Sequence, residues 1–477
     1  MKSYLFYDLE TSGLNKSFDQ ILQFAAIRTD TELNEIDRYS INVKLRPDVI
    51  PSPYASITHR ISIEESRKGL PECVAVRHIH ALHNTPGTLS LGYNTLGFDD
   101  EFLRFSFYRN LLTPYTHQYA NKCNRADILP FTVLYYLYKN ETLNWPTIDG
   151  KPSLKLEYLS QNNNLATGRA HDAIVDVEAT VELARRFYQE KEMWQYVLGY
   201  FDKKTDKDRT YKLSSAFESA AGIHMYGLMT GIKFGADNLY QAPVLYIGDS
   251  IPYSNQSLWL RLDLPELREL DINDISANSR VIRKRFGESP IILPPVERFT
   301  QKISVERRAI VDGNIKWLQS EKDTFYKLIN YYREFEYQDY PNVDVDAGLY
   351  INGFMTKEET KLCHKFNRSS FDQMQSVIDD FSEGSLKELA KRAFLRNFFD
   401  EISGDAYKDF ESYLKAVNPV DKNDAMTDFR GDKKMTPASA LEDIKEIKKE
   451  HKLDDEQLML IKEIENYIEE RFGAVAL

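Results

Sequence analysis

The sequence has few cysteines and no long apolar run. Its three cysteines, Cys73, Cys123 and Cys363, lie far apart and form no C-x-x-C pair, which argues against a disulfide framework and against a thiolate metal site. No stretch reaches the roughly 18 consecutive apolar residues that a membrane-spanning helix needs, and the first residues lack the form of an export signal. We therefore expect a protein of the reducing cytoplasm that does not span a membrane.

Glycine and proline are also scarce. The 477 residues include 21 glycines and 18 prolines, against 29 tyrosines and 26 phenylalanines, which excludes collagen-like and low-complexity proteins. At about 150 residues per domain, the length indicates two or three domains. The net charge of −12 disfavours a polyanionic partner held by bulk electrostatics alone. It remains compatible with a local basic groove beside carboxylates that hold metal ions.

The hydrophobic pattern divides the chain into three parts. The first part, residues 1–190, predicts a mixed α/β domain, with strands at 4–9, 21–29, 39–44 and 88–93 and helices at 72–83, 99–111, 128–138 and 172–188. The second part, residues 191–338, predicts a small β-rich domain, with strand-like pieces at 231–236, 242–248 and 257–262. The third part, residues 339–477, is strongly helical and ends in an amphipathic helix at 454–472.

Two carboxylates stand at the end of the first predicted strand. Asp8 and Glu10 are two positions apart, and because side chains alternate across a strand, both project from the same face. Burying two such charges is costly unless a cation neutralises them, and carboxylate oxygens suit Mg²⁺ or Mn²⁺. The pair is therefore a candidate metal site, although most D-x-E pairs are surface residues.

Another acidic group lies where a predicted strand leads into a helix. The segment Gly92-Tyr93-Asn94 is followed by Phe98-Asp99, so we expect Asp99 at the start of a helix, where the helix dipole favours an anion. An ordinary helix cap is the simpler interpretation. Asp100 and Glu101 follow directly, and spacing alone does not indicate which of the three carboxylates faces a site.

A histidine and an aspartate open the last long helix of the first domain. His171 and Asp176 are five positions apart, a rotation of about 140° on a helix. The two side chains therefore converge only if His171 lies in the preceding loop or the first turn, which makes Asp172 the expected N-cap. A lone histidine near a helix start is more often structural than catalytic.

Together these elements resemble the ordered motifs of the DEDDh exonucleases, a family named for four acidic residues and a histidine. The five functional positions are matched in order by Asp8, Glu10, Asp99, His171 and Asp176. A longer resemblance, to the bacterial exonuclease I family, covers nearly the whole chain. It is carried by Phe6-Tyr7-Asp8-Leu9-Glu10-Thr11, Leu91-Gly92-Tyr93-Asn94, Phe98-Asp99-Asp100-Glu101, Ala170-His171-Asp172-Ala173, Asn144-Trp145-Pro146 and the run from Asp344 to Tyr350.

The resemblance implies a fold of three parts: an α/β RNase H-like nuclease domain (1–190), an SH3-like β domain (191–338) and an α-helical C-terminal domain (339–477). It implies that the four carboxylates hold two divalent ions, Mg²⁺ or alternatively Mn²⁺, and that His171 is the general base. The implied activity is a single-strand-specific 3′→5′ exodeoxyribonuclease that releases 5′-mononucleotides in DNA repair and recombination. Two metals and a base supply the nucleophile and the charge neutralisation that phosphodiester hydrolysis needs.

Binding a single strand requires aromatic faces for the bases and basic side chains for the phosphates. Residues 104–119 interleave the two types, although a helix that packs its aromatics into the core accounts for more than half of them. By resemblance, Arg104, Tyr115 and Tyr119 contact DNA, with Tyr119 in place of a tryptophan, and Glu10 and Lys155 contact the substrate. Lys155 replaces an arginine, which keeps the charge but loses bidentate phosphate geometry.

The resemblance also implies a monomer, with single-stranded DNA as its partner. By analogy alone, it adds the C-terminal tail of single-stranded DNA-binding protein as a second partner. Two alternatives remain open. One is an exonuclease that trims RNA or short oligonucleotides with the same catalytic residues. The other is a non-catalytic single-strand-binding platform, which is disfavoured because no metal carboxylate is missing.

Overall fold

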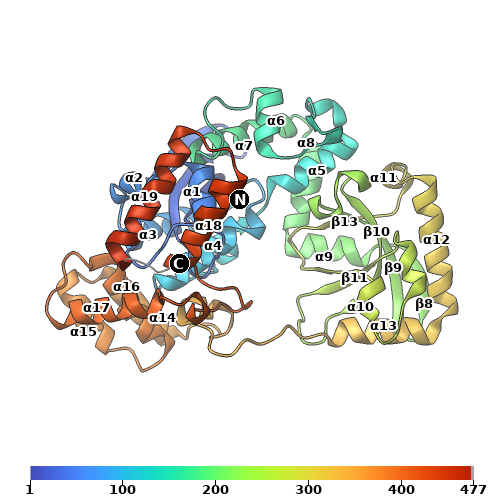
Figure 1. The fold of residues 1–477 in the computed structure, drawn as a ribbon. Coiled ribbons are helices and arrows are strands. Elements are labelled where there is room, and N and C mark those ends of the chain that lie inside the picture. The colour runs from blue at the N-terminus through green and yellow to red at the C-terminus, as the bar shows by residue number, and fades with distance from the viewer. Residues whose placement is uncertain (1, 474–477) are drawn as a thin grey trace. The chain divides into compact units, whose positions relative to one another are not determined.

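The computed structural model describes residues 2–473, and these form two compact units (Figure 1). Of the described residues, unit 1 takes 2–125, 166–181 and 338–473, and unit 2 takes 126–165 and 182–337. The division into three domains at residues 190 and 338 stays a prediction. Within residues 2–473, no helix combines the length and the apolar character needed to cross a membrane.

A five-stranded sheet lies at the centre of unit 1, in the order β3-β2-β1-β4-β5. Its strands are β1 (Ser3–Thr11), β2 (Ile21–Thr29), β3 (Glu35–Asn42), β4 (Thr88–Leu91) and β5 (Asn124–Arg125). The first three strands are antiparallel, and β4 runs parallel to β1. The strands predicted at 4–9 and 21–29 are confirmed, but β3 begins at Glu35 rather than at the predicted residue 39, since the turn that follows β2 is short.

Helices α3 (Glu72–His83) and α4 (Asp99–Arg109) pack against this sheet. Phe102 and Phe107 of α4 contact the sheet core, whereas Phe105 and Tyr108 belong to the core of the C-terminal helices. Helix α4 is therefore buried on both sides. The aromatics in the first half of segment 104–119 are core residues, in agreement with the simpler interpretation.

The C-terminal part of unit 1 is helical, as predicted, and makes two cores with the rest of the unit. One core surrounds α4, and the other joins the last two helices to the short helices α1 (Pro53–His59) and α2 (Ile63–Arg67). The C-terminal helices are α14 (Lys357–Arg368), α15 (Phe371–Asp379), α16 (Ser385–Phe398), α17 (Asp405–Val417), α18 (Pro437–Glu450) and α19 (Asp455–Phe472).

Unit 2 contains a six-stranded sheet in the order β12-β11-β10-β9-β13, with β8 paired to β9. The strands are β8 (Ser215–Ser219), β9 (Gly222–Thr230), β10 (Gln241–Asp249), β11 (Ser257–Arg261), β12 (Val281–Lys284) and β13 (Ile291–Leu293). A separate hairpin pairs β6 (Thr147–Ile148) with β7 (Lys151–Pro152). The helices are α5 (Ile128–Tyr138), α6 (Leu156–Asn163), α8 (Lys191–Leu198), α9 (Lys203–Tyr211), α10 (Ile275–Asn278), α11 (Glu297–Thr300), α12 (Val305–Ser320) and α13 (Lys322–Glu334).

Two features of unit 2 differ from the sequence-based expectation. The predicted strand at residues 231–236 is wrong, because Gly231 and Gly235 interrupt the chain there and single 3₁₀ turns follow each of them. The strand in this region is β9, which ends just before Gly231. Helices α12 and α13 were not predicted, and they cover the sheet with Val311, Leu318 and Leu328.

A buried ion network ties the N-terminal and C-terminal parts of unit 1 together. Asp48 accepts from Arg46 Nε at 3.1 Å and lies 3.1 Å from Arg396 Nε, and Arg396 also pairs with Asp346. Burial alone would raise the pKa of Asp48, but the guanidinium groups of Arg396 and Arg46 outweigh it and hold that pKa below its usual range. The network therefore stabilises the fold only while its carboxylates are ionised.

We predict that Asp48→Asn lowers the free energy of unfolding by about 3–5 kcal/mol, because it leaves buried guanidinium groups without their carboxylate. Urea unfolding at pH 7 measures this change. The free energy of unfolding of the wild type should fall as the pH drops below about 4 and through the lowered pKa of Asp48 in the folded state. The free energy of unfolding of the variant should fall less over the same pH range. As a control, Asp400→Asn should have little effect, since Asp400 is 64% exposed although it pairs with Lys44 at 2.9 Å. Equal losses from both variants would contradict the assigned role of the network.

Candidate active site

Asp8 and Glu10 lie on one face of β1, half-buried at the end of the strand. The pairing of β1 with β2 fixes the positions of both carboxylates, since Asp8 is opposite Ala25 and Glu10 is opposite Gln23 on β2. A register shift follows directly after Glu10 and ends the regular pairing. The predicted shared orientation of the two carboxylates is thereby explained by ordinary strand geometry.

Asp99 reaches the same place from the turn after β4. Gly92 allows this approach, because a Cβ atom there would lie 2.6 Å from the carbonyl oxygen of Tyr7 on β1. Asn94 takes a left-handed conformation, with φ of 64°, and one 3₁₀ turn leads into α4. Asp99 is the first residue of α4, is buried, and raises the pKa of Asp8 by its charge.

The two carboxylates after Asp99 face elsewhere. Asp100 is 1% exposed and accepts from His117 Nε2 at 3.0 Å, with Arg104 and Arg125 also paired to it. Glu101 accepts from Tyr350 Oη at 3.2 Å. Asp99 is therefore the one of these three that faces the carboxylates of β1, a choice that sequence spacing left open.

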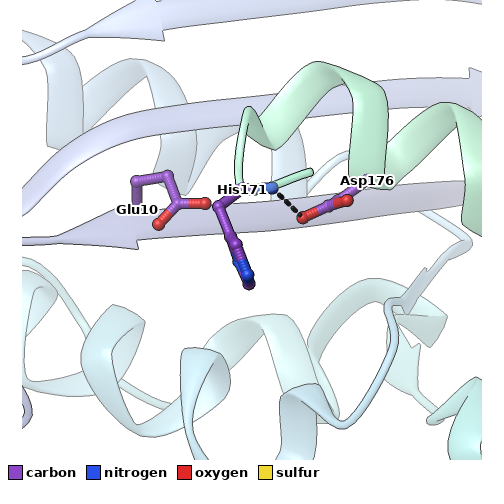
Figure 2. Close-up of side chains that lie close together, drawn as sticks. All are labelled: Glu10, His171 and Asp176. Atoms are coloured by element: carbon purple, nitrogen blue, oxygen red, sulfur yellow. Dashed lines mark hydrogen bonds between the residues drawn. The ribbon is translucent and has the colours of Figure 1, made fainter. Parts of the chain in front are cut away.

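His171 lies in the loop before α7 (Ala173–Tyr188), as its convergence with Asp176 required. Its φ is 63°, and its backbone N–H donates to Asp176 Oδ2 at 3.2 Å. Asp172 precedes α7 and its carbonyl accepts from Asp176 N at 3.1 Å. Figure 2 shows His171 between Glu10 and Asp176, and one ligand atom from each of the three lies within 4.8 Å of the others.

The crowded carboxylates repel one another. Burial raises the pKa of Asp8 well above its usual value, and the charges of Asp99, Glu10 and Asp176 raise it further. Burial, followed by the charges of Asp176 and Asp99, raises the pKa of Glu10 to about 9. Such a set of oxygen donors fits divalent cations, because a cation offsets both the burial and the mutual repulsion.

A pocket of about 530 Å³ adjoins Glu10. The C-terminal part of the chain contributes to it, as do α1 and the loop after β1. Its lining includes Glu10, Leu14, Asn15, Asp19, Tyr54, Thr58, His59, Phe98, Lys433, Met435 and Asp443. No local sequence pattern predicts this pocket, because its walls come from segments hundreds of residues apart.

The residues predicted to contact DNA are divided between the two units. Arg104 and Tyr115 belong to unit 1, where the Arg104 guanidinium stands 5.7 Å from the ring centre of Tyr350. Tyr119 is 70% exposed. Lys155 lies in unit 2 and is exposed, with its Nζ 3.9 Å from Glu157.

Comparison with known proteins relates both ends of the chain to nucleases. Residues 5–184 match the family described as Exonuclease, and residues 343–471 match the Exonuclease I C-terminal domain. Exodeoxyribonuclease I of Escherichia coli strain K12 is 30% identical over 378 residues, which cover 74% of this chain and 77% of the relative. The chain belongs to the exodeoxyribonuclease I family. It is therefore an exonuclease, a hydrolase of phosphodiester bonds.

Solved structures of the family support the same fold. E. coli exonuclease I in complex with a dT13 oligonucleotide is 24% identical, with a TM-score of 0.83 over 99% of this chain and 100% of that chain. A moderately thermophilic exonuclease I from Methylocaldum szegediense is also 24% identical, with a TM-score of 0.80 over 99% of this chain and 100% of that chain. The predicted fold class is confirmed: an RNase H-like α/β domain, an SH3-like β domain and a helical C-terminal domain.

We predict that the metal-free protein, kept in a chelator, loses stability as the pH rises from about 4 toward 9. Asp8 and Glu10 then ionise in the folded state at pKa values above their unfolded values, which favours unfolding. Asp8→Asn should raise the Tm of the metal-free protein and flatten this dependence, and Mg²⁺ should raise the wild-type Tm at neutral pH. Thermal denaturation measures all three effects.

The control for this prediction is Asp37→Asn, on the exposed face of β3. It removes one negative charge far from the carboxylate cluster and should leave the pH dependence unchanged. A lower Tm for metal-free Asp8→Asn would show that the Asp8 charge is balanced by the protein itself.

Proposed function

We propose that this family member is a single-strand-specific 3′→5′ exodeoxyribonuclease that releases 5′-mononucleotides. The convergence of Asp8, Glu10, Asp99, His171 and Asp176 beside one pocket carries the proposal. Relatives support the choice of substrate, since one solved E. coli exonuclease I is described as a complex with a dA16 oligonucleotide. Another is described as the zinc ion bound form of an exonuclease I complex with single-stranded DNA.

Asp8, Glu10, Asp99 and Asp176 are the proposed ligands of two divalent ions, Mg²⁺ or alternatively Mn²⁺. When bound, such ions neutralise the charge that develops on a phosphate and make a water molecule more acidic. The residues themselves contribute a fixed geometry, because β1, α4 and α7 are packed elements rather than free loops. Carboxylates held this way need no rearrangement when the phosphate arrives.

His171 is the proposed general base. Its imidazole is exposed and lies beside Glu10 and Asp176, two of the proposed metal ligands, and its proposed role is to take a proton from the water molecule that attacks the terminal phosphodiester. An imidazole can accept a proton at neutral pH. The hydrogen bond from its backbone N–H to Asp176 ties the position of the base to that of a ligand.

The pocket beside Glu10 is the proposed site of the 3′-terminal nucleotide. Apolar side chains such as Leu14, Tyr54 and Phe98 offer surface for a base. His59 is buried, and burial lowers its pKa to about 4, so its ring enters the pocket wall in the neutral form. A nucleotide seated there has its phosphodiester directed toward the carboxylates.

Arg104, Tyr115, Tyr119 and Lys155 are the proposed contacts to the remainder of the strand. Asp100 and Tyr350 hold Arg104 in place, and its guanidinium carries the charge proposed to contact a phosphate. Tyr119 provides an exposed ring for stacking. A monomeric state and docking of the tail of single-stranded DNA-binding protein remain predictions from the family resemblance.

A gel assay tests the proposed reaction. We expect Mg²⁺-dependent shortening of 5′-labelled single-stranded DNA, and no shortening of 3′-blocked DNA, duplex DNA or RNA. Asp176→Asn should abolish cleavage, and His171→Gln should slow it by about 10² to 10⁴-fold. Cleavage of RNA as well as DNA would favour an oligonucleotide-trimming enzyme. Salt-sensitive binding without cleavage would favour a binding platform.

We predict that Arg104→Ala raises KM for single-stranded DNA several-fold while kcat stays within about twofold. Arg104 is expected to contact a phosphate that is distant from the reacting bond. Its loss should therefore weaken the binding of the substrate and of the transition state equally. The salt dependence of DNA binding should also decrease by about one counterion. Lys68→Ala is the control, since Lys68 is exposed and pairs with Glu64 on the short helix α2. A fall in kcat alone would contradict the proposed role.

A further inference from the structure

The loop between β1 and β2, residues 12–20, forms one wall of the pocket and is internally ordered. The carboxylate of Asp19 accepts from the backbone N–H of Asn15 at 2.8 Å. The side-chain oxygen of Asn15 accepts from Ser17 N at 3.0 Å and from Phe18 N at 3.3 Å. Asn15 therefore sets the turn with its oxygen, and its amide nitrogen points away from the loop.

Helix α4 holds this loop from one side. The guanidinium of Arg109 is 1% exposed and donates to the carbonyl oxygens of Lys16 at 2.9 Å and Asp19 at 2.8 Å. It also donates to the carbonyl oxygen of Ser17. This contact fixes the end of the loop that returns to β2, but it leaves the tip near Leu14 to be fixed by other groups.

A segment of the C-terminal part, Asp428–Met435, holds the loop from the other side. Asp428 is 4% exposed, and its Oδ2 accepts from Asn15 Nδ2 at 3.3 Å. Its Oδ1 accepts from Arg430 N at 2.8 Å and Asp432 N at 2.9 Å, which closes the turn that Asp428 begins. The Asp428 carboxylate thus orders its own turn and also binds loop 12–20 through Asn15.

The same segment reaches the pocket directly and is firmly anchored. Lys433 and Met435 line the pocket that adjoins Glu10. Between them, Lys434 is buried and donates to Asp48 O at 3.0 Å and Asn418 Oδ1 at 2.6 Å. The buried ion network around Asp48 therefore supports this wall of the pocket.

We infer that Asp428–Met435 is a wall of the terminal-nucleotide pocket, and that Asp428 is a positioning residue that holds loop 12–20 through Asn15. This inference rests on the proposed function, and it assigns to the C-terminal part a role at the 3′ terminus. A pocket wall that is already ordered spares the nucleotide the cost of ordering it on binding, so loosening the loop weakens binding more than it slows the chemistry. A displaced loop alters the seat of the nucleotide without touching the carboxylates.

Exchanging the two groups tests the inference. Asn15→Asp keeps the oxygen that caps Ser17 and Phe18, but it sets a carboxylate against Asp428. Asp428→Asn keeps the oxygen that closes its own turn, but it sets an amide against Asn15. In the double variant, donor and acceptor are both present again with their places reversed. Asp424→Asn is the control, because it removes a charge from an exposed turn nearby.

The measurement is KM and kcat on a single-stranded tetranucleotide, together with Tm. We expect each single variant to raise KM about 5- to 10-fold, with kcat within about twofold, and the double variant to return KM to within about twofold of wild type. An unchanged KM with a lowered Tm, or no recovery in the double variant, would overturn the inference. An inactive wild-type enzyme would instead overturn the proposed function, and this inference with it.

Discussion

The mutual repulsion of four carboxylates is the constraint on which the rest of unit 1 depends. Asp8, Glu10, Asp99 and Asp176 come from three separate elements, and burial together with their charges raises the pKa of the two on β1. A protein chain brings such groups together only if packing elsewhere offsets the cost. The central sheet, α4 buried on both of its sides, and the tightly turned loop before α7 are the elements that supply that packing.

The C-terminal helices take part in this arrangement. They bury one side of α4 and thereby fix the helix whose first residue is Asp99. The buried carboxylates of Asp48 and Asp346 also fix the segments in which they lie, because arginines from both parts of the unit balance their charges. The residues 343–471 that match the Exonuclease I C-terminal domain therefore also pack against the helix that carries Asp99 of the candidate active site.

The sequence was most informative where local rules decide the outcome. Helices α3 and α5 and strand β2 have the predicted bounds, because hydrophobic periodicity and flanking polar residues mark them. The five motif residues were identified by their resemblance to the DEDDh motifs, since spacing alone did not separate Asp99 from Asp100 and Glu101, and the structure brings them to the end of β1. Their chemical roles stay predictions.

Long-range contacts were not predictable in the same way. The bond between Asn15 and Asp428 spans 413 positions, and neither residue belongs to a local pattern. The separate partners of Asp100 and Glu101 come from other segments of the chain, since His117 and Arg125 pair with Asp100 and Tyr350 donates to Glu101. The wrong strand at 231–236 had apolar residues in a suitable order, but glycines at both ends allow the chain to turn there instead.

The most direct test of the account is the number of Mn²⁺ ions bound per chain, counted by electron paramagnetic resonance at neutral pH. We expect two ions for the wild-type protein, and loss of at least one in Asp8→Asn and in Asp176→Asn. A wild-type chain that binds no ion at millimolar Mn²⁺, or variants that bind as many ions as the wild type, would contradict the claim that these carboxylates form a metal-dependent hydrolytic site.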